Sequence, residues 1–190
     1  MRVSFLRLLR TIMYWPRSHA YADDTQLYLL FNADLATSQN DAVEAMEQCI
    51  QAIQSWMIEN KLHINDGKTE LMIIGTKKQL TKMNIDCLTV SESSIVPVTS
   101  VRNLGSWFDQ NLSMIPHINK ICNAASFYIY NIRRIRKYLT VDARHTLVHC
   151  IVIGRLDYCN CLLYKVPAIH ISKLQHIQKC FPTRMFNTEV

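Results

Sequence analysis

The sequence predicts an α+β fold in which antiparallel strands and a helix are followed by an all-helical region. Hydrophobic residues make up 49% of the 190, which is enough to bury a core. Only four glycines and five prolines occur, so long flexible linkers are not expected. Near residue 112 the apolar pattern changes from short β-prone runs to a helical stripe. The expected parts are an unassigned basic segment (1–18), an α+β segment (19–112) and a helical segment (113–190).

The α+β segment begins with residues 26–32, which predict a buried strand. Asn40 or Asp41 is expected to cap a helix. The apolar face of this helix is spaced by threes and fours, at Val43, Met46, Ile50, Ile53 and Met57. Residues 62–64 and 69–74 predict paired strands, joined by a tight turn at Asp66 and Gly67. Short β-prone runs then fill residues 84–108.

The helical segment predicts three helices. Pro116 suits the first turn of a helix that runs to about Tyr138. Thr140 is a candidate cap for a second helix, with Asp142 favourably placed in its first turn. A third helix is expected over residues 171–180, where Pro182 would stop it.

Charge is distributed unevenly. Residues 1–22 carry four arginines and no acid, residues 23–112 carry six Lys/Arg against twelve Asp/Glu, and residues 113–190 carry eleven against three. The acidic part therefore suits bound cations, and the basic part suits phosphates. A simply solvated basic helix surface is the alternative.

The seven cysteines are odd in number and form no Cys-x-x-Cys pair. This pattern favours reduced, mostly buried thiols in an intracellular protein of the cytoplasm or nucleus over a secreted disulfide framework. Arg2, Arg7 and Arg10 interrupt the apolar residues at the start, so neither a signal peptide nor a membrane span is expected there.

Asp23 and Asp24 are the candidate metal ligands. Neighbouring side chains on a strand point to opposite faces, but a hairpin tip lets two adjacent carboxylates reach one region. A divalent cation between them relieves their repulsion, and Mg²⁺, or Mn²⁺ in its place, prefers such oxygen ligands. Taken alone, such a pair is more often a helix N-terminus or a solvated loop.

The surrounding residues resemble the reverse transcriptases of non-LTR (LINE-type, jockey-like) retrotransposons. Residues 21–28 (YADDTQLY) resemble the palm hairpin, and residues 60–65 (NKLHIN) with 68–70 (KTE) resemble the next palm motif. Residues 101–105 (VRNLG) resemble the primer grip. The helical region after the palm is matched by residues 132–136 (IRRIR), 156–163 (LDYCNCLL) and 174–178 (LQHIQ). Several motifs in order are more specific than any one of them.

The resemblance implies a partial reverse-transcriptase palm followed by a helical, thumb-like region, with an RNA template and a DNA primer as partners. Asp23 and Asp24 would be catalytic metal ligands, and Lys68 would act near the triphosphate as a proton donor to pyrophosphate. The implied nucleic-acid contacts are Tyr21, Leu104, Gly105, Arg133, Arg134, Arg136 and Lys137. Arg133 and Lys137 are spaced to share one side of a helix.

The chain departs from the family pattern before the turn. No Asp or Glu precedes Asp23, so the upstream catalytic carboxylate is missing, as are the fingers. Residues 14–18 do not resemble the strand that leads into the turn, and Pro16 would weaken a central strand there. We therefore expect weak metal binding and no polymerase activity from this fragment alone, unless a separate chain supplies the missing half.

Two other interpretations remain. A non-catalytic, basic helical nucleic-acid-binding module is suggested by Tyr128, Tyr130, Tyr138 and Tyr158, which lie among Arg and Lys residues, although tyrosines at this spacing are more often core residues. A zinc site is a weaker alternative, formed from His145, His149, Cys150, Cys159 and Cys161. The Cys-x-Cys spacing is too short for it, and Cys150 and Cys159 are expected to be core thiols. No nucleophilic triad or glycine-rich phosphate loop is visible.

Overall fold

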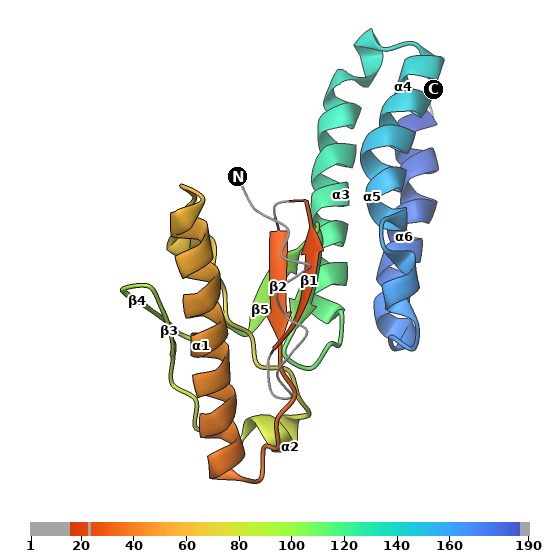
Figure 1. Cartoon of the computed structure of the whole chain (residues 1–190). Coiled ribbons are helices and arrows are strands. Elements are labelled where there is room, and N and C mark those ends of the chain that lie inside the picture. Colours follow the sequence, from red (N-terminus) through yellow and green to blue (C-terminus); the bar gives the residue numbers. More distant parts are fainter. Residues whose placement is uncertain (1–15, 23, 187–190) are drawn as a thin grey trace. The chain divides into compact units, whose positions relative to one another are not determined.

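The computed structural model describes residues 16–22 and 24–186, with side chains as far as Lys179. Helices are combined with small antiparallel strand pairs, which confirms the α+β class (Figure 1). The chain forms two compact units that divide between Thr99 and Ser100. This division lies earlier in the chain than the boundary expected near residue 112, so the hairpin at residues 100–109 belongs with the helices.

The first unit opens with a hairpin of β1 (Arg17–Tyr21) and β2 (Asp24–Tyr28), joined by a two-residue loop. Strand β1 leads into the acidic turn, although residues 14–18 do not resemble the family's strand at this place. Pro16 directly precedes it, a position where proline's missing N–H interrupts no ladder. The strand predicted over residues 26–32 ends at Tyr28, and Leu30 beyond it is 93% exposed.

Helix α1 (Ala36–Glu59) begins earlier than predicted, so Asn40 and Asp41 lie inside it and cap nothing. Its start is fixed by Gln39, whose buried side-chain amide donates to the carbonyls of Ala33 and Lys82 and accepts from the amide of Asn84. The predicted apolar face is confirmed, because Ile50 and Met57 are buried.

The strands predicted at residues 62–64 and 69–74 do not form. The 3₁₀ helix η1 (Asp66–Lys68) occupies the expected turn, and Leu71 makes only an isolated bridge to Pro97. Short helix α2 (Lys77–Leu80) follows, and then a hairpin of β3 (Leu88–Val90) and β4 (Ser93–Ile95). The small core of this unit is formed by Ile50, Leu88 and Val90.

The second unit begins with a hairpin of β5 (Ser100–Asn103) and β6 (Ser106–Asp109), followed by helix α3 (Ile115–Ile135). Pro116 lies in the first turn of α3, as predicted. The buried imidazole of His117 accepts a hydrogen bond from the amide of Trp107 (N–Nδ1 3.3 Å), which ties α3 to β6. The 3₁₀ helix η2 (Arg136–Tyr138) then extends α3.

The second helical run consists of α4 (Val141–Leu147), the π-helix η3 (Val148–Ile153) and α5 (Gly154–Asp157). The hydroxyl of Thr140 accepts from the amide of Ala143 and confirms the predicted cap. After η4 (Asn160–Leu163), helix α6 (Ala168–Phe186) completes the bundle. Contrary to prediction, Pro182 does not end α6, since proline removes a single backbone hydrogen bond and only one further turn follows it.

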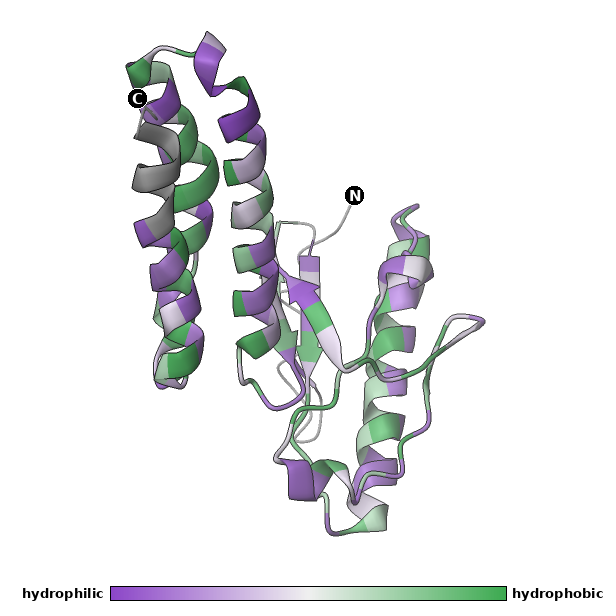
Figure 2. Cartoon of the chain, turned by 180° about the vertical axis from the view of Figure 1, so that it is seen from behind, coloured by the Kyte–Doolittle hydropathy of each residue, from purple (hydrophilic) through white to green (hydrophobic). Residues whose placement is uncertain are grey.

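The core of the second unit lies among α3, η3, α5 and α6, which run side by side (Figure 1). Its buried members include Ile118, Ala125, Ile132, Val148, Val152, Leu156, Leu174 and Ile177. Hydrophobic and strongly hydrophilic residues occupy different sides of α3, and hydrophilic residues gather at its C-terminal end (Figure 2). Among the described residues, no helix is both long and apolar enough to cross a bilayer.

Candidate functional site

The acidic turn lies at the tip of the β1–β2 hairpin. Tyr21 and Asp24 are the last paired residues, and the loop between them consists of Ala22 and Asp23. Ala22 has a φ of +52°, as the first position of a tight hairpin loop requires. Tyr21 is 62% exposed and Asp24 is partly buried, while Asp23 lies outside the described residues. The predicted strand–strand turn at this motif is therefore present.

Carboxylate oxygens at this tip have the chemistry that Mg²⁺ prefers. Within residues 16–22 and 24–186, no three His, Cys, Asp or Glu side chains are grouped so that they could hold a metal ion. Magnesium is commonly bound by one or two carboxylates together with water and substrate phosphates, so Asp23 and Asp24 would supply part of its coordination shell. Lys68, the predicted proton donor, ends η1 with its side chain exposed.

The predicted primer-grip turn is a second two-residue hairpin loop. Leu104 and Gly105 connect β5 to β6 with φ values of +44° and +88°. Tyr158, which follows α5, donates its hydroxyl hydrogen to the carbonyl oxygen of Leu104. The φ of Gly105 favours glycine, and a Cβ at this position would lie 3.2 Å from Cε1 of the same ring, which is a tight contact. The side chain of Leu104 is 38% exposed.

The predicted phosphate-binding residues follow one another at the end of α3. Arg133 and Arg134 occupy its last turn, and Arg136 and Lys137 begin η2. Because the α-helix ends between these pairs, the regular spacing that would align Arg133 with Lys137 is interrupted. Arg133, Arg134 and Lys137 are exposed, whereas Arg136 is partly buried.

Three of the four tyrosines of this region are more exposed than predicted. Tyr130, Tyr138 and Tyr158 are 60%, 77% and 47% exposed, so they are not core residues. Tyr128 is partly buried and packs against the core, as predicted. The guanidinium of Arg134 lies 5.9 Å from the ring centroid of Tyr130, and the ammonium of Lys137 lies 4.9 Å from that of Tyr138. Their exposure makes the rings accessible to a ligand.

No family model matches the chain, and no curated protein or solved structure matches it significantly.

Two surface aromatics on the second unit were not singled out in the sequence. Phe127, on the outer side of α3, is 60% exposed. The second is Trp107 on β6, where the ammonium of Lys120 lies over the ring, 3.4 Å from its centroid. The regular spacing of Lys120, Phe127 and Arg134 was the signal that could have identified this face.

The structure does not support the zinc alternative, and it supports the buried-thiol prediction only in part. His145, His149, Cys150 and Cys161 are exposed, and within the described part of the chain they form no metal-binding group. Cys150 is therefore not a core thiol, because its helical position faces outward, and Cys159 is only partly buried. Cys49 and Cys122 are buried, and burial raises the pKa of both thiols; the nearby Lys173 ammonium opposes this effect at Cys122.

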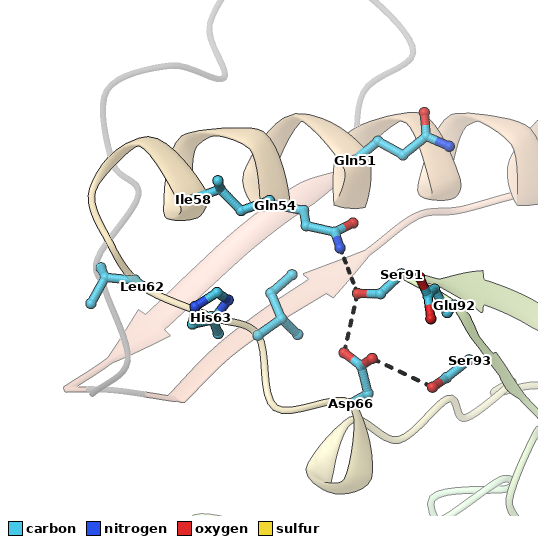
Figure 3. A pocket seen from close by; sticks show the side chains of 10 residues that line it. Gln51, Gln54, Ile58, Leu62, His63, Asp66, Ser91, Glu92 and Ser93 are labelled. Carbon is cyan, nitrogen blue, oxygen red and sulfur yellow. Dashed lines mark hydrogen bonds between the residues drawn. The ribbon is translucent and has the colours of Figure 1, made fainter.

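A cavity of about 640 Å³ lies in the first unit between α1, η1 and the β3–β4 turn (Figure 3). The carboxylate of Asp66 accepts hydrogen bonds from the hydroxyls of Ser91 and Ser93. The side-chain amide of Gln54 donates a hydrogen bond to the Ser91 hydroxyl. The lining residues include the acids Asp66 and Glu92 but no lysine or arginine. The cavity is therefore unsuited to phosphate groups. Nothing in the sequence pattern indicated it, because its walls come from three separate segments.

Proposed function

We propose that this chain contributes the palm hairpin and the helical, duplex-gripping part of a reverse transcriptase of the non-LTR retrotransposon type. Its role is to bind an RNA template paired with a DNA primer. Nucleotidyl transfer in such an enzyme is metal-dependent and requires a further carboxylate and fingers. The 190-residue chain by itself is a binding protein without polymerase activity.

The observation that carries the proposal is the geometry of the acidic turn. Its sequence is Tyr21-Ala22-Asp23-Asp24, and the structure shows the flanking segments paired as a hairpin with a two-residue loop. A helix N-terminus and an irregular loop were the ordinary alternatives for an Asp-Asp pair. The paired strands on both sides do not fit either of them.

A second two-residue turn supports the same proposal. Leu104 and Gly105 stand where the resemblance expects the primer grip, and they close a hairpin with positive φ at both positions. Tyr158 belongs to another segment of the resemblance, at residues 156–163, and it contacts this turn directly. Two motifs that are far apart in sequence are thus adjacent within one compact unit.

A non-catalytic nucleic-acid-binding protein is the second candidate. Between Asp109 and Asp142 the sequence contains five Lys/Arg and no acid, and two of these cations, Arg134 and Lys137, lie beside exposed tyrosines. Such a surface binds phosphates whether or not the acidic turn holds a metal.

The test is a binding titration with a labelled RNA–DNA template–primer over a range of salt concentrations. The double variant R133A/R134A is expected to bind more weakly and to reduce the slope of log K against log salt by up to about two. The control K77A/K78A removes the same charge from exposed positions on α2 and is expected to leave binding unchanged.

The outcomes separate the two candidates. Preference for the RNA–DNA hybrid over duplex DNA of the same sequence supports the reverse-transcriptase proposal, because A-like geometry is then recognised. Equal binding of both duplexes favours the general nucleic-acid-binding protein. Absence of salt-dependent binding contradicts both.

A further inference from the structure

The outer side of α3 carries a regular row of cationic and aromatic side chains. Lys120, Phe127 and Arg134 are spaced by seven residues, which is close to two helical turns, so they lie in one line along the helix. Tyr130 lies beside this line, between Phe127 and Arg134. We call Lys120, Phe127, Tyr130 and Arg134 the outer row.

The opposite side of the same helix is core. Ile118, Ala125 and Ile132 have the same seven-residue spacing and are 0%, 0% and 4% exposed. Each of them precedes a member of the outer row by two residues, which places it about 200° away around the helix. The bundle is therefore packed on the inner side of α3 and leaves the outer row to solvent.

The outer row combines cations with aromatic rings that are only partly covered. Phe127 and Tyr130 are each 60% exposed. Arg134 lies at the ring of Tyr130, and Lys120 lies over the neighbouring Trp107. Helix α3 contains no acidic residue, so its side chains contribute only positive charge along the outer row.

We infer that the outer row of α3 binds single-stranded nucleic acid by stacking unpaired bases on Phe127 and Tyr130. This inference rests on the proposed function only in that the chain binds nucleic acid. The cations Lys120 and Arg134 hold the phosphates on either side of the stacked bases.

Single strands fit this surface better than duplexes do. In a duplex the faces of the bases are covered by their neighbours, and a protein reaches only phosphates, sugars and base edges. Phe127 has no hydrogen-bonding group, so it adds nothing to phosphate binding or to edge readout. An unpaired base offers the π-face on which an exposed phenyl ring stacks.

The experiment measures binding of the full chain to RNA of about 12 nucleotides, a length within the usual site size of single-strand binders. Three probes share one length and label: the single strand, its duplex with complementary DNA, and a strand of abasic sugars. We expect the single strand to bind about tenfold more tightly than the abasic strand, because only the former has bases to stack.

The variant F127A/Y130A is expected to remove that tenfold advantage and to leave binding of the abasic strand unchanged. Y164A is the matched control, since Tyr164 is also exposed (80%) and lies beside Lys165, but on a different segment. It is expected to bind all three probes like the unmodified chain.

Equal binding of the single and abasic strands by the unmodified chain would overturn the inference, and this comparison needs no variant. Salt-dependent duplex binding with no effect of F127A/Y130A would overturn the inference and leave the proposed function intact. Binding of none of the probes would overturn both. Self-association that F127A/Y130A abolishes, without any change in RNA binding, would identify the row as a contact between copies and also overturn the inference.

Discussion

The hydroxyl of Tyr158 donates a hydrogen bond to the carbonyl oxygen of Leu104, 54 residues earlier in the chain. The bond joins the end of α5 to the tip of the β5–β6 hairpin. Together with the bond from the Trp107 amide to His117, this contact holds the hairpin against the helices. Tyr158→Phe retains the ring and removes the bond, and it is expected to lower the free energy of unfolding by about 1 kcal/mol. Urea unfolding measures the change, and Tyr164→Phe, at an exposed position, should leave stability unaltered.

Gly105→Ala is expected to destabilise the second unit by more than about 1 kcal/mol. The added methyl group meets the ring of Tyr158 at 3.2 Å, and alanine is strained at a φ of +88°. Gly154→Ala is the control, because its added Cβ would lie at an ordinary 3.7 Å from the carbonyl oxygen of His149 and alanine favours helix. Thermal unfolding compares the two variants. Equal melting temperatures for the two variants would show that neither the positive φ nor the contact with Tyr158 disfavours alanine at position 105.

Stability is expected to fall with acidity through His117. Burial lowers the pKa of this imidazole, so the folded chain binds a proton less readily than the unfolded chain does. The contribution of His117 is therefore complete above about pH 6.5, the ordinary histidine pKa, and declines as the pH falls below it. Protonation of Nδ1 would also remove the acceptor for the Trp107 amide.

His117→Asn retains an acceptor and cannot titrate. The variant is expected to be less stable at neutral pH, since it loses imidazole packing, and its melting temperature is expected to depend less on pH below about 6.5. His149→Asn, at an exposed helical position, is the matched control and should keep the slope of the unmodified chain. If the melting temperature of His117→Asn has the same pH dependence as that of the unmodified chain, groups other than His117 cause this dependence.

Thiol reactivity is expected to follow exposure. Cys150 and Cys161 are exposed, whereas Cys49 and Cys122 are buried and have raised pKa values, so fewer of the buried thiols are in the reactive thiolate form. Brief treatment with iodoacetamide followed by peptide mass spectrometry should find the exposed pair alkylated first. Alkylation of Cys49 at the rate of Cys150 would contradict the packing of α1.

The purified 190-residue chain is expected to extend no primer with either Mg²⁺ or Mn²⁺. Residues 1–22 contain no carboxylate, so the turn offers only Asp23 and its neighbour Asp24 to a metal. Primer extension on a gel is the measurement, and Asp24→Asn should be indistinguishable from the unmodified chain. Extension that Asp24→Asn abolishes would refute the prediction. Extension that appears only after a separate polymerase segment is added would identify a partner acting in trans.

Local patterns predicted the helices of the second unit well. The stripe through Ile118, Ala125 and Ile132 faces the core, and Thr140 caps α4, because both features depend on residues within a few positions of one another. The acidic turn and the Leu104–Gly105 turn were predicted from the resemblance of their motifs to those of the family. Their loops have positive φ at Ala22, Leu104 and Gly105, and of these three residues only Gly105 favours that conformation.

Long-range contacts decided the elements that were predicted wrongly. Gln39 bonds to Lys82 and Asn84, and α1 therefore starts before the apparent cap at residue 40. Asp66 accepts from Ser91 and Ser93, which favours a 3₁₀ turn over the predicted hairpin. Neither partner is visible from the neighbouring sequence. The exposure of Tyr130 also depends on long-range packing, because the other helices cover only one side of α3.

The π-helix η3 accommodates one more residue than a regular α-helix would need at this point. Val148, Val152 and Leu156, spaced by four, are all buried across this segment. In a regular α-helix, positions four apart drift by about 40° at each step, whereas the wider turn of a π-helix reduces this drift. Removing one residue from η3 would leave the same three side chains spaced by three and four, which suits one face of an α-helix. The chain therefore tolerates a change of length here without turning Leu156 away from the core.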